Sequence, residues 1–376
     1  MSNKLRLVTI VGTRPEIIKL SETMKAADEY FDHIIVHTGQ NWDYTLNEIF
    51  FKDLGIRQPD YYLDSVGKNL GETIGNIVHK SYEILLEVKP DALLVLGDTN
   101  SALSAISAKR LKIPIFHMEA GNRCFDENLP EEINRKIVDH ISDVNLPYTE
   151  HARRYLLSEG VRKEHTFVTG SPMPEIINAF IDNINGSDVV SRLKLKKDKY
   201  ILVSAHREEN IDNEENFLSL MNALNDVAEK YKFPIIYSTH PRTQAMLHKR
   251  GFTPHVLVRN LKPFGFFDYN QLQRNAFCVL SDSGTLAEES NILGFSAISL
   301  RTSTERPEVL DKGSFVVGGI NSEDILQAIE MVNAMKKNGV KNKRAVDYTD
   351  ENVSVKVVAL IQSYVKIVNS VVWHKR

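Results

Sequence analysis

Short, nearly unbroken runs of Val, Ile and Leu alternate with helical patterns along the chain, and the alternation starts again in its second half. Such runs are typical of strands covered on both faces, and the helical segments between them supply the right-handed crossovers of a parallel sheet. In the first half the runs are LRLVTIVG, IIVHTG, ALLVLGD, IPIFHME, DVNLPY and FVTG. In the second half they are YILVSAH, PIIYSTH, HVLVRN, FCVLSDSG, SAISLR and SFVVGG. The sequence therefore predicts an α/β fold with two doubly wound, Rossmann-like domains.

The expected boundary between the domains lies near GSPMPEI, residues 170–176, where one glycine and two prolines interrupt the pattern. We expect an N-terminal domain over residues 1–172 and a C-terminal domain over residues 173–352. The last segment, from about 353 to 376, has apolar residues at helical spacing. We expect this helix to pack back onto the N-terminal domain.

The composition indicates a globular protein and argues against several classes of partner. The 376 residues are 42% apolar and 25% charged, and a formal net charge of -3 gives no basic field for nucleic acid or an anionic membrane surface. No segment reaches the roughly 20 apolar residues that span a bilayer. The two cysteines, Cys124 and Cys278, offer neither a disulfide framework nor metal-ligand spacing, so a reducing cytoplasm fits best.

The first predicted strand is followed by GTRPEIIK, residues 12–19, which combines a turn with basic side chains. Gly12 permits a tight turn, and Arg14, Lys19 and the amide groups of the helix start would favour an anion. A plain strand-to-helix turn with solvated basic residues explains the same segment equally well. No strand-to-helix turn of the chain has the pattern GxGxxG, which argues against a dinucleotide redox cofactor.

Two neighbouring strands of the first half end in carboxylates. Asp98 follows ALLVLG and Glu119 follows IPIFHM, and ligands of parallel sheets bind beyond these strand ends. Asp98 alone would be explained more simply as part of a cap on the next helix. The presence of Glu119 on the neighbouring strand favours a site.

Glu131 and Glu132 follow Pro130 at a predicted helix start, where acidic residues complement the helix dipole. Glu131 also lies one turn from Arg135, so these residues leave a structural and a chemical role equally open. His140 is expected at the surface or in a satisfied hydrogen bond. The apolar face of this helix is expected to pack in the core through Ile133, Ile137, Val138 and Ile141.

Strand ends of the second half supply cations. SAHREEN places His206 and Arg207 after one strand, and STHPR places His240 and Arg242 after the next. Two such pairs favour an anion site over separate structural histidines. The segment SDSGTLAEE, residues 281–289, then offers a turn of small residues that enters a helix whose amide groups could hold a diphosphate. A helix capped by serine is its plain alternative.

Four further residues of the second half have a possible role in binding. Either Glu288 or Glu289, one turn into the helix, could reach ribose hydroxyl groups. Arg306 in TSTERPE could complete an anion site or be a solvated residue of a helix start. Tyr269 in FGFFDYNQL could stack on a base, although an aromatic residue there more often belongs to the core.

Together, VGTRPEIIK, LGDTNS, HMEAGNR, PEEINR, SAHREE, SDSGTLAEE and TERPE resemble, in order and spacing, the motifs of the non-hydrolysing UDP-N-acetylglucosamine 2-epimerase family. The resemblance covers nearly the whole chain. It implies a GT-B arrangement of the two domains, an active site in the cleft between them, and a UDP-sugar substrate. We also expect a cytoplasmic homodimer that uses neither NAD nor a metal ion and has no nucleic acid or membrane partner.

The resemblance places the catalytic carboxylates of the family at Asp98, Glu119 and Glu131 and its catalytic histidine at His206. It leaves Glu132 as the capping charge of its helix. The residues expected to bind UDP and the sugar are Arg14, Lys19, Arg135, Arg207, Tyr269, Ser283, Gly284, Thr285, Glu289 and Arg306.

The chain departs from the UDP-N-acetylglucosamine branch of this family at two places. That branch has a Gln-His-Arg stretch after the second strand and a second glycine in the DSG turn, whereas this chain has Gln40-Asn41-Trp42 and Thr285. The first stretch helps to form the allosteric site of bacterial members, so the resemblance does not extend to that site. The segments HTGQNWDYTLNEIFF, GNRCFD and SAHREENID instead resemble the branch that converts UDP-2-acetamido-2,6-dideoxy-L-talose to UDP-N-acetyl-L-fucosamine for capsule or O-antigen precursors.

The proposed chemistry requires these types of residue. The hydrogen on C2 of a 2-acetamido sugar is not acidic, so inversion needs either a transient ketone, and hence a nicotinamide, or elimination. Because the dinucleotide motif is missing, we expect elimination of UDP to a 2-acetamidoglycal, followed by its re-addition. Crowded carboxylates should have pKa values pushed apart, so that one can donate a proton while another accepts one. His206 and the arginines would stabilise the charge on leaving UDP.

Four other functions remain open on the sequence. A UDP-N-acetylglucosamine 2-epimerase would give UDP-N-acetylmannosamine. A GT-B glycosyltransferase would need an acceptor, and a hydrolysing epimerase would release UDP with a free sugar. A nucleotide-sugar sensor would bind its ligand without turnover.

Overall fold

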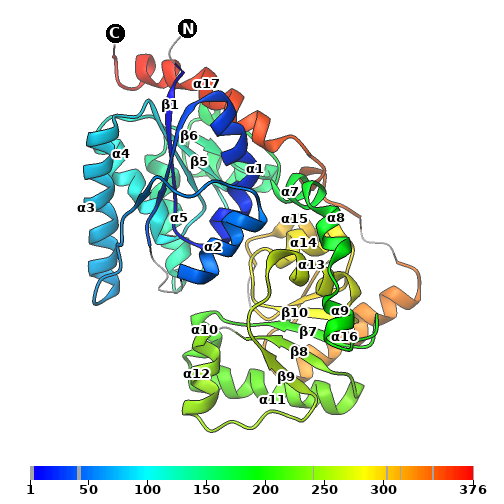
Figure 1. Cartoon of the computed structure of the whole chain (residues 1–376). Coiled ribbons are helices and arrows are strands. Elements are labelled where there is room, and N and C mark those ends of the chain that lie inside the picture. Colours follow the sequence, from blue (N-terminus) through cyan, green and yellow to red (C-terminus); the bar gives the residue numbers. More distant parts are fainter. Residues whose placement is uncertain are drawn as a thin grey trace. The chain divides into compact units, whose positions relative to one another are not determined.

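The chain consists of two compact units (Figure 1). Unit 1 comprises Met1–Ala179 and Thr349–Arg376, and unit 2 comprises Phe180–Tyr348. The structure, a computed structural model, describes residues 4–39, 44–239, 241–301, 304–313, 315–340 and 343–375. The sequence pattern places the boundary just before helix α7 (Met173–Ala179), whereas in the structure α7 belongs to unit 1, because it contacts α1 (Arg14–Tyr30) and buries Met173, Ile176 and Ile177.

Unit 1 contains a six-stranded parallel sheet in the order β3-β2-β1-β4-β5-β6. Its strands are β1 (Arg6–Val11), β2 (Asp32–His37), β3 (Tyr61–Tyr62), β4 (Ala92–Leu96), β5 (Ile115–Met118) and β6 (Val144–Leu146). Five of them lie in the predicted apolar runs. The predicted run FVTG is wrong, because residues 167–170 lie outside any strand and only the preceding Thr166 forms an isolated bridge, to Asn145. The short edge strand β3 has no apolar run and was not predicted.

Helices cover the sheet of unit 1, and the C-terminal helix returns to this unit. α17 (Val353–Val371) lies beside α1, although the two come from opposite ends of the chain (Figure 1). The side chains of Val357, Ile361 and Val365 are buried at helical spacing, which explains why this helix packs as its sequence predicts. The other helices of unit 1 are α2 (Tyr44–Asp53), α3 (Leu70–Val88), η1 (Asn100–Ser104), α4 (Ala105–Arg110), α5 (Pro130–Ile141), α6 (Glu150–Ser158) and η2 (Lys163–His165).

Unit 2 repeats this architecture with the strand order β12-β11-β10-β7-β8-β9, again all parallel. Each strand lies in a predicted run: β7 (Ile201–Ser204), β8 (Ile235–Ser238), β9 (Val258–Leu261), β10 (Cys278–Ser281), β11 (Ala297–Ser299) and β12 (Val316–Val317). The helices are α8 (Ile181–Gly186), α9 (Val189–Arg192), α10 (Glu208–Ile211), α11 (Glu214–Tyr231), α12 (Pro241–Lys249), α13 (Phe266–Asn275), α14 (Leu286–Leu293), α15 (Pro307–Leu310), α16 (Ser322–Lys337) and η3 (Val346–Tyr348). The predicted class of two Rossmann-like units is therefore confirmed.

Candidate active site

The carboxyl ends of β4 and β5 bring Asp98 and Glu119 to one edge of the unit 1 sheet. Leu96 and Met118 are paired in register, and the Gly97 amide donates to the Met118 carbonyl at 2.9 Å. Both strands then turn through left-handed backbone, at Gly97 (φ +68°) and Glu119 (φ +61°). A β-carbon on Gly97 would lie 3.6 Å from Glu119 Oε2, so the Glu119 carboxylate lies directly over the Gly97 turn. The structure thus places these two predicted residues side by side.

Glu119 forms a buried ion pair with Lys19 of α1. Lys19 Nζ donates to Glu119 Oε1 at 2.7 Å and to Oε2 at 2.6 Å, and the two side chains are only 7% and 9% exposed. Left-handed backbone costs a residue such as Glu119 about 1–2 kcal/mol, so the fold holds this carboxylate against its own backbone preference. The resemblance assigns Lys19 to nucleotide binding, but in the structure its ammonium group balances the charge of a candidate catalytic carboxylate.

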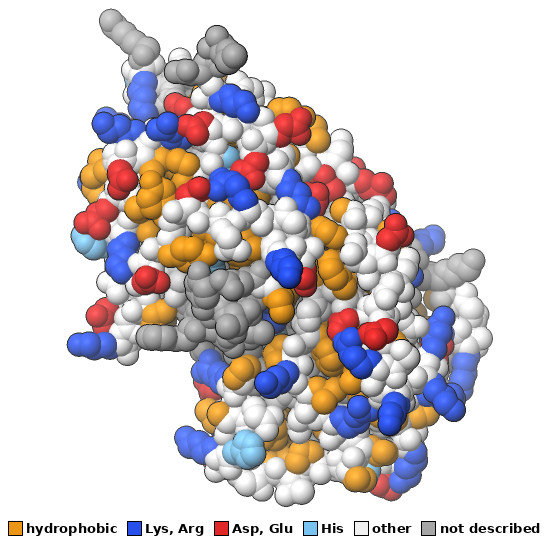
Figure 2. All heavy atoms as spheres, in the orientation of Figure 1, with side chains coloured by type: hydrophobic (Ala, Val, Ile, Leu, Met, Phe, Trp, Pro, Cys, Tyr) orange, Lys and Arg blue, Asp and Glu red, His pale blue; other side chains and the backbone are white. Residues whose placement is uncertain are grey.

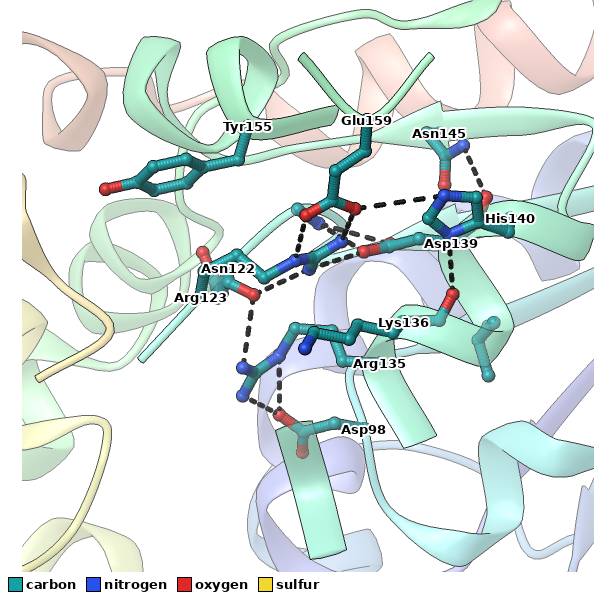
Figure 3. Close-up of polar contacts among 12 residues, drawn as sticks. Asp98, Asn122, Arg123, Arg135, Lys136, Asp139, His140, Asn145, Tyr155 and Glu159 are labelled. Atoms are coloured by element: carbon teal, nitrogen blue, oxygen red, sulfur yellow. Dashed lines mark hydrogen bonds and ion pairs between the residues drawn. The ribbon is translucent and has the colours of Figure 1, made fainter. Parts of the chain in front are cut away.

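Asp98 is held by Arg135 of α5 (Figure 3). Arg135 Nε donates to Asp98 Oδ2 at 3.1 Å, and Nη2 donates to the same oxygen. The other side of the guanidinium donates through Nη1 to Glu132 Oε2 at 2.7 Å and to the Asn122 carbonyl at 3.1 Å. Each of the two candidate carboxylates at the strand ends therefore contacts a different cation, and Arg135 is shared between Asp98 and Glu132.

Glu132 is not the capping charge that the sequence indicates. Its side chain is fully buried, it pairs with Arg135, and it accepts the amides of Cys124 and Phe125 at 3.2 and 3.4 Å. The helix cap at Leu129 has no side-chain hydrogen bond. The spacing of Glu132 and Arg135, three residues apart, could have indicated this pair.

Glu131 lies in the first turn of α5 and is half-buried. Its side chain has no hydrogen bond or ion pair to any residue that the structure describes. Asn134 and Arg135, three and four residues further on, both contact Asp98. The Asn134 side chain donates to the Asp98 carbonyl at 3.0 Å, and Arg135 Nε donates to the Asp98 carboxylate at 3.1 Å. Residues at these spacings share one helix face, so Glu131 lies one turn from the contacts of Asp98.

The prediction that the apolar face of α5 packs in the core is wrong for two residues. Ile133 and Ile137 are 48% and 39% exposed, whereas Val138 is fully buried. The helix instead turns Asn134, Arg135 and its buried Asp139 inward, because these polar groups have partners at the strand ends. His140 is exposed, as expected, and its ring contacts the Lys136 carbonyl at 2.8 Å.

The sequence did not predict a buried polar network around Asp139, whose contact with Arg123 is drawn in Figure 3. Asp139 Oδ1 accepts the Gly121 amide at 3.1 Å and lies 3.0 Å from His117 Nδ1, and Asp139 Oδ2 accepts Arg123 Nη1 at 2.7 Å. On its far side, the His117 ring donates from Nε2 to the Gly97 carbonyl at 2.8 Å. Burial alone would raise the pKa of Asp139, but His117 and Arg123 together lower it below its usual value. This network fixes the backbone on both sides of Glu119.

In unit 2, adjacent strands β7 and β10 bring His206, Arg207 and the turn of residues 283–285 to one edge, with Ser204 and Ser281 paired in register. The fully buried Asp282 ties them together, because it accepts the amides of His206 and Arg207, both at 2.9 Å. The sequence pattern did not indicate this role of Asp282, although the residue stands inside the DSG motif.

The turn itself has the close approach that its small residues predict. A β-carbon on Gly284 would lie 2.7 Å from Glu305 Oε1 and 4.0 Å from Arg207 Nη2. Ser283 and Thr285 are partly exposed, their hydroxyl groups lie 3.0 Å apart, and neither makes a side-chain cap of α14. The plain alternative of a serine-capped helix is therefore not what forms.

Three predicted binding residues of unit 2 are buried or half-buried, and none of them is a fully solvated surface residue. Glu289 is 7% exposed and accepts the Gln273 side chain at 2.5 Å, and Arg306 is 2% exposed with Nη2 2.7 Å from Glu288. Tyr269 of α13 is half-buried. Arg306 is thus not a solvated residue of a helix start.

Some predicted residues make contacts other than those above, and some lie outside the residues that the structure describes. Arg14 is half-buried at the start of α1, 5.6 Å from the Phe50 ring, and Arg242 pairs with Asp212 at the start of α12. His240 and the stretch Gln40-Asn41-Trp42 lie outside the described residues. Within the described ranges, no group of three or more His, Cys, Asp or Glu residues could hold a metal ion, and no helix is long and apolar enough to cross a membrane.

Comparison with known proteins supports a common origin over the whole chain. A family model described as UDP-N-acetylglucosamine 2-epimerase matches residues 24–362. The chain is 47% identical to a solved protein described as UDP-N-acetylglucosamine 2-epimerase from Rickettsia bellii, with a TM-score of 0.91 over 99% of this chain and 100% of that one. It is 33% identical to the Methanocaldococcus jannaschii UDP-GlcNAc 2-epimerase solved in complex with UDP-GlcNAc and UDP, with a TM-score of 0.89 over 96% of this chain and 100% of that one.

A curated relative has a different substrate in its name. It is the UDP-2,3-diacetamido-2,3-dideoxy-D-glucuronate 2-epimerase of Pseudomonas aeruginosa, which is 34% identical over 329 residues, 86% of this chain and 91% of the relative. Similar chains therefore include proteins named for more than one UDP-sugar.

Proposed function

Because the chain belongs to the UDP-N-acetylglucosamine 2-epimerase family, a family of isomerases, we propose that it inverts C2 of a UDP-2-acetamido sugar by elimination and re-addition of UDP. The observation that carries this proposal is the pair of carboxylates at the ends of β4 and β5, Asp98 and Glu119, each in contact with a different cation. A reaction that removes and returns a proton at one carbon requires such a group for each transfer.

In the proposed reaction, a base takes the proton from C2 while the bond between C1 and the diphosphate oxygen breaks. The electron pair of the C2–H bond forms the double bond of the 2-acetamidoglycal, and UDP leaves with the electron pair of the C1–O bond. UDP then adds back to C1, and an acid delivers a proton to the opposite face of C2. Asp98, Glu119 and Glu131 are the candidates for base and acid.

The diphosphate needs donors when it departs with its negative charge. Unit 2 supplies His206, Arg207 and the turn of residues 283–285, and a donor placed in advance at such a position is worth about 3–4 kcal/mol in the transition state. Arg14 of unit 1 is a further candidate. The half-exposed His206 ring lies 3.5 Å from buried Asp282, which limits its orientation.

For the particular substrate, we propose UDP-2-acetamido-2,6-dideoxy-L-talose, converted to UDP-N-acetyl-L-fucosamine for a capsule or O-antigen precursor. The support is the local sequence resemblance of residues 37–51, 121–126 and 204–212 to that branch. UDP-N-acetylglucosamine, converted to UDP-N-acetylmannosamine, is the second candidate, favoured by the names of the similar proteins from R. bellii and M. jannaschii.

Incubation in D₂O tests both levels of this proposal. Each candidate UDP-sugar is supplied without acceptor or nicotinamide, and C2 is followed by NMR. Deuterium at C2 together with the epimer supports elimination, and the faster substrate identifies the branch. Deuterium at C2 of neither sugar, nor of the 2,3-diacetamido analogue, would overturn the proposed reaction, and net release of free UDP would indicate a hydrolysing enzyme.

We further propose that the protein is a cytoplasmic homodimer. Its two cysteines are free, which agrees with a reducing compartment. In unit 1, the consecutive helices α3, α4 and α5 contact one another, and α3 and α5 expose Tyr82, Leu86, Ile133 and Ile137. Figure 2 shows hydrophobic side chains gathered on the face over α3. Light scattering of the wild type and of Ile133→Lys tests the proposal: we expect a dimer that the substitution dissociates, and a wild-type monomer would contradict it.

A further inference from the structure

Glu16, in the first turn of α1, is buried although the proposed chemistry does not use it. The residue is 1% exposed. Its Oε2 accepts the Gly12 amide at 3.1 Å and the Thr13 hydroxyl at 2.8 Å, and its Oε1 accepts the Ser101 hydroxyl. One carboxyl group therefore joins the end of β1 to the loop that follows β4.

The two segments that Glu16 joins both carry candidate site residues. The turn after β1 carries Arg14, and the loop after β4 carries Asp98, three residues before Ser101. Within that loop, the hydroxyl groups of Thr99 and Ser101 are hydrogen-bonded at 2.6 Å. The arrangement from Asp98 to Ser101 is thus fixed on one side by Glu16, and on the other side His117 holds the Gly97 carbonyl.

We propose that Glu16 is a positioning residue of the reaction, whose buried carboxylate locks the Asp98 loop onto the turn that carries Arg14. This inference rests on the proposed function, because it takes Asp98 as a reacting group. Glu16 itself does not touch the substrate. A reacting group displaced by about 1 Å can cost a hundredfold in rate, so a lock at this position has a direct effect on turnover.

The charge of Glu16 decides whether the lock is complete. All three groups donate to the carboxyl group; the ionised form accepts all three, whereas the protonated form must donate from one oxygen and so reverses or loses one of these hydrogen bonds. Burial raises the pKa of Glu16 to about 6, against the hydrogen bonds from Ser101, Thr13, Gly12 and Thr99. None of these causes is a charged group. Three charged side chains stand on the two segments: Arg14 lies two residues before Glu16, Lys19 pairs with Glu119, and Asp98 pairs with Arg135.

A purely stabilising role does not explain this carboxylate. A raised pKa means that folding disfavours the ionised form, so at neutral pH the ionised side chain lowers the stability of the fold. Glutamine would fill the same volume without that cost. The three contacts of the Glu16 carboxylate with the turn and the loop are therefore better explained by the geometry that they impose on the loop.

The test compares wild type, Glu16→Gln, and the exposed Glu29→Gln on the same helix. Amide hydrogen exchange of residues 98–104, corrected for the intrinsic effect of pH, reports the lock without any need for turnover. We expect exchange in the wild type and in Glu29→Gln to rise severalfold between pH 7.5 and pH 5. In Glu16→Gln it should already be fast at pH 7.5 and should not change further.

Turnover gives the second readout. We expect kcat of Glu16→Gln at pH 7.5 to be about ten- to a hundredfold below that of the wild type, with little change in KM. Ser101→Ala, which keeps Glu16 and removes only its contact with the loop, should show the same fast exchange and the same fall in kcat. Wild-type exchange and wild-type kcat in both variants would overturn the inference. A wild type that deuterates C2 of no UDP-sugar would instead overturn the proposed function, whatever the exchange data show.

Discussion

Lys19 and Glu119 form a buried ion pair that joins the first turns of α1 to the end of β5, with Lys19 Nζ within 2.7 Å of both carboxylate oxygens. The ammonium group also lies 5.9 Å from the centre of the Tyr148 ring, so its surroundings are largely apolar. In such surroundings an unpaired charge is costly. The pair therefore places a compensating cation against Glu119, and the assignment of Lys19 to the nucleotide alone misses this contact.

Replacement of Lys19 by methionine should separate these two roles. Methionine keeps the apolar length of the side chain and leaves Glu119 buried without its cation, which typically destabilises a fold by about 3–5 kcal/mol. We expect C2 deuteration to fall by at least a hundredfold, while the Kd for UDP, measured by calorimetry, changes by less than about threefold.

Lys25→Met is the matched control on the same helix. Lys25 forms a partly exposed pair with Glu22 one turn away on the same helix, and helical pairs at this spacing contribute only about 0.2–0.5 kcal/mol. A large loss of UDP affinity in Lys19→Met, with Lys25→Met unaffected, would contradict the role argued here and favour a direct contact of Lys19 with the nucleotide.

The sequence predicts most of the fold because each buried parallel strand is recognisable from its own short run of apolar residues. β1, β4 and β5 are mostly apolar, and the ends of β4 and β5 deliver Asp98 and Glu119 as expected. The partners of these residues cannot be recognised in this way, because they come from distant segments of the chain. Lys19 is 100 residues from Glu119, and Arg135 is 37 residues from Asp98.

α5 illustrates the limit of pattern reading. Its spacing suggests that Ile133 and Ile137 face the core, but the helix buries a polar face instead, because Arg135 and Asp139 find charged partners at the strand ends. The stability that those ion pairs add depends on residues outside the helix, which the spacing of apolar residues within the helix does not reveal. The same reason explains why Glu132 was mistaken for a capping charge.

Glu131 and Glu132 are neighbours with opposite expected behaviour, and their glutamine variants form a matched pair. Glu132 is fully buried against Arg135, so Glu132→Gln should destabilise unit 1 by about 3 kcal/mol. Trp373 lies in the described part of unit 1, and the only other tryptophan of the sequence, Trp42, falls within the residue range of that unit, so tryptophan fluorescence in urea measures the free energy of unfolding of unit 1. Glu131→Gln should leave this free energy within about 0.5 kcal/mol of the wild type.

Glu131→Gln should lower activity for a catalytic reason, and not because the fold is less stable. We expect Glu131→Gln to lower kcat by about 10²–10⁴, the usual contribution of an acid or base, in a protein of normal stability. Normal turnover in Glu131→Gln would remove Glu131 from the list of working carboxylates, and the reaction would then have to be assigned to Asp98 and Glu119.

Asp139 should make unit 1 sensitive to acid. Its folded pKa is lowered below the usual 3.8, so its contribution to stability is present above that value and is lost as the pH falls through the folded pKa. Asp139→Asn should destabilise unit 1 by about 3–5 kcal/mol at pH 7, because Arg123 and His117 lose their common anion. It should also flatten the loss of stability below about pH 4.

Urea titrations at pH 7, 5 and 3.5, followed by tryptophan fluorescence, measure this effect. Glu83→Gln, an exposed change on α3 of the same unit, is the control and should keep the wild-type pH profile. An Asp139→Asn profile parallel to that of the wild type would show that Asp139 is not a source of the acid sensitivity.

Gly284→Ala should weaken UDP binding through the turn of unit 2. The new methyl group would lie 2.7 Å from Glu305 Oε1, and Glu305 cannot simply swing away because Arg301 Nη1 holds its other oxygen at 3.0 Å. Overpacking of this kind costs about 1–3 kcal/mol, so we expect the Kd for UDP to rise about tenfold or more.

Gly294→Ala, at the other end of α14, is the control: its left-handed backbone (φ +76°) makes alanine unfavourable, but no atom lies within 4 Å of the added carbon. Calorimetry should therefore find weaker UDP binding in Gly284→Ala and unchanged binding in Gly294→Ala. Equal affinities in both variants and the wild type would mean that UDP does not contact this turn.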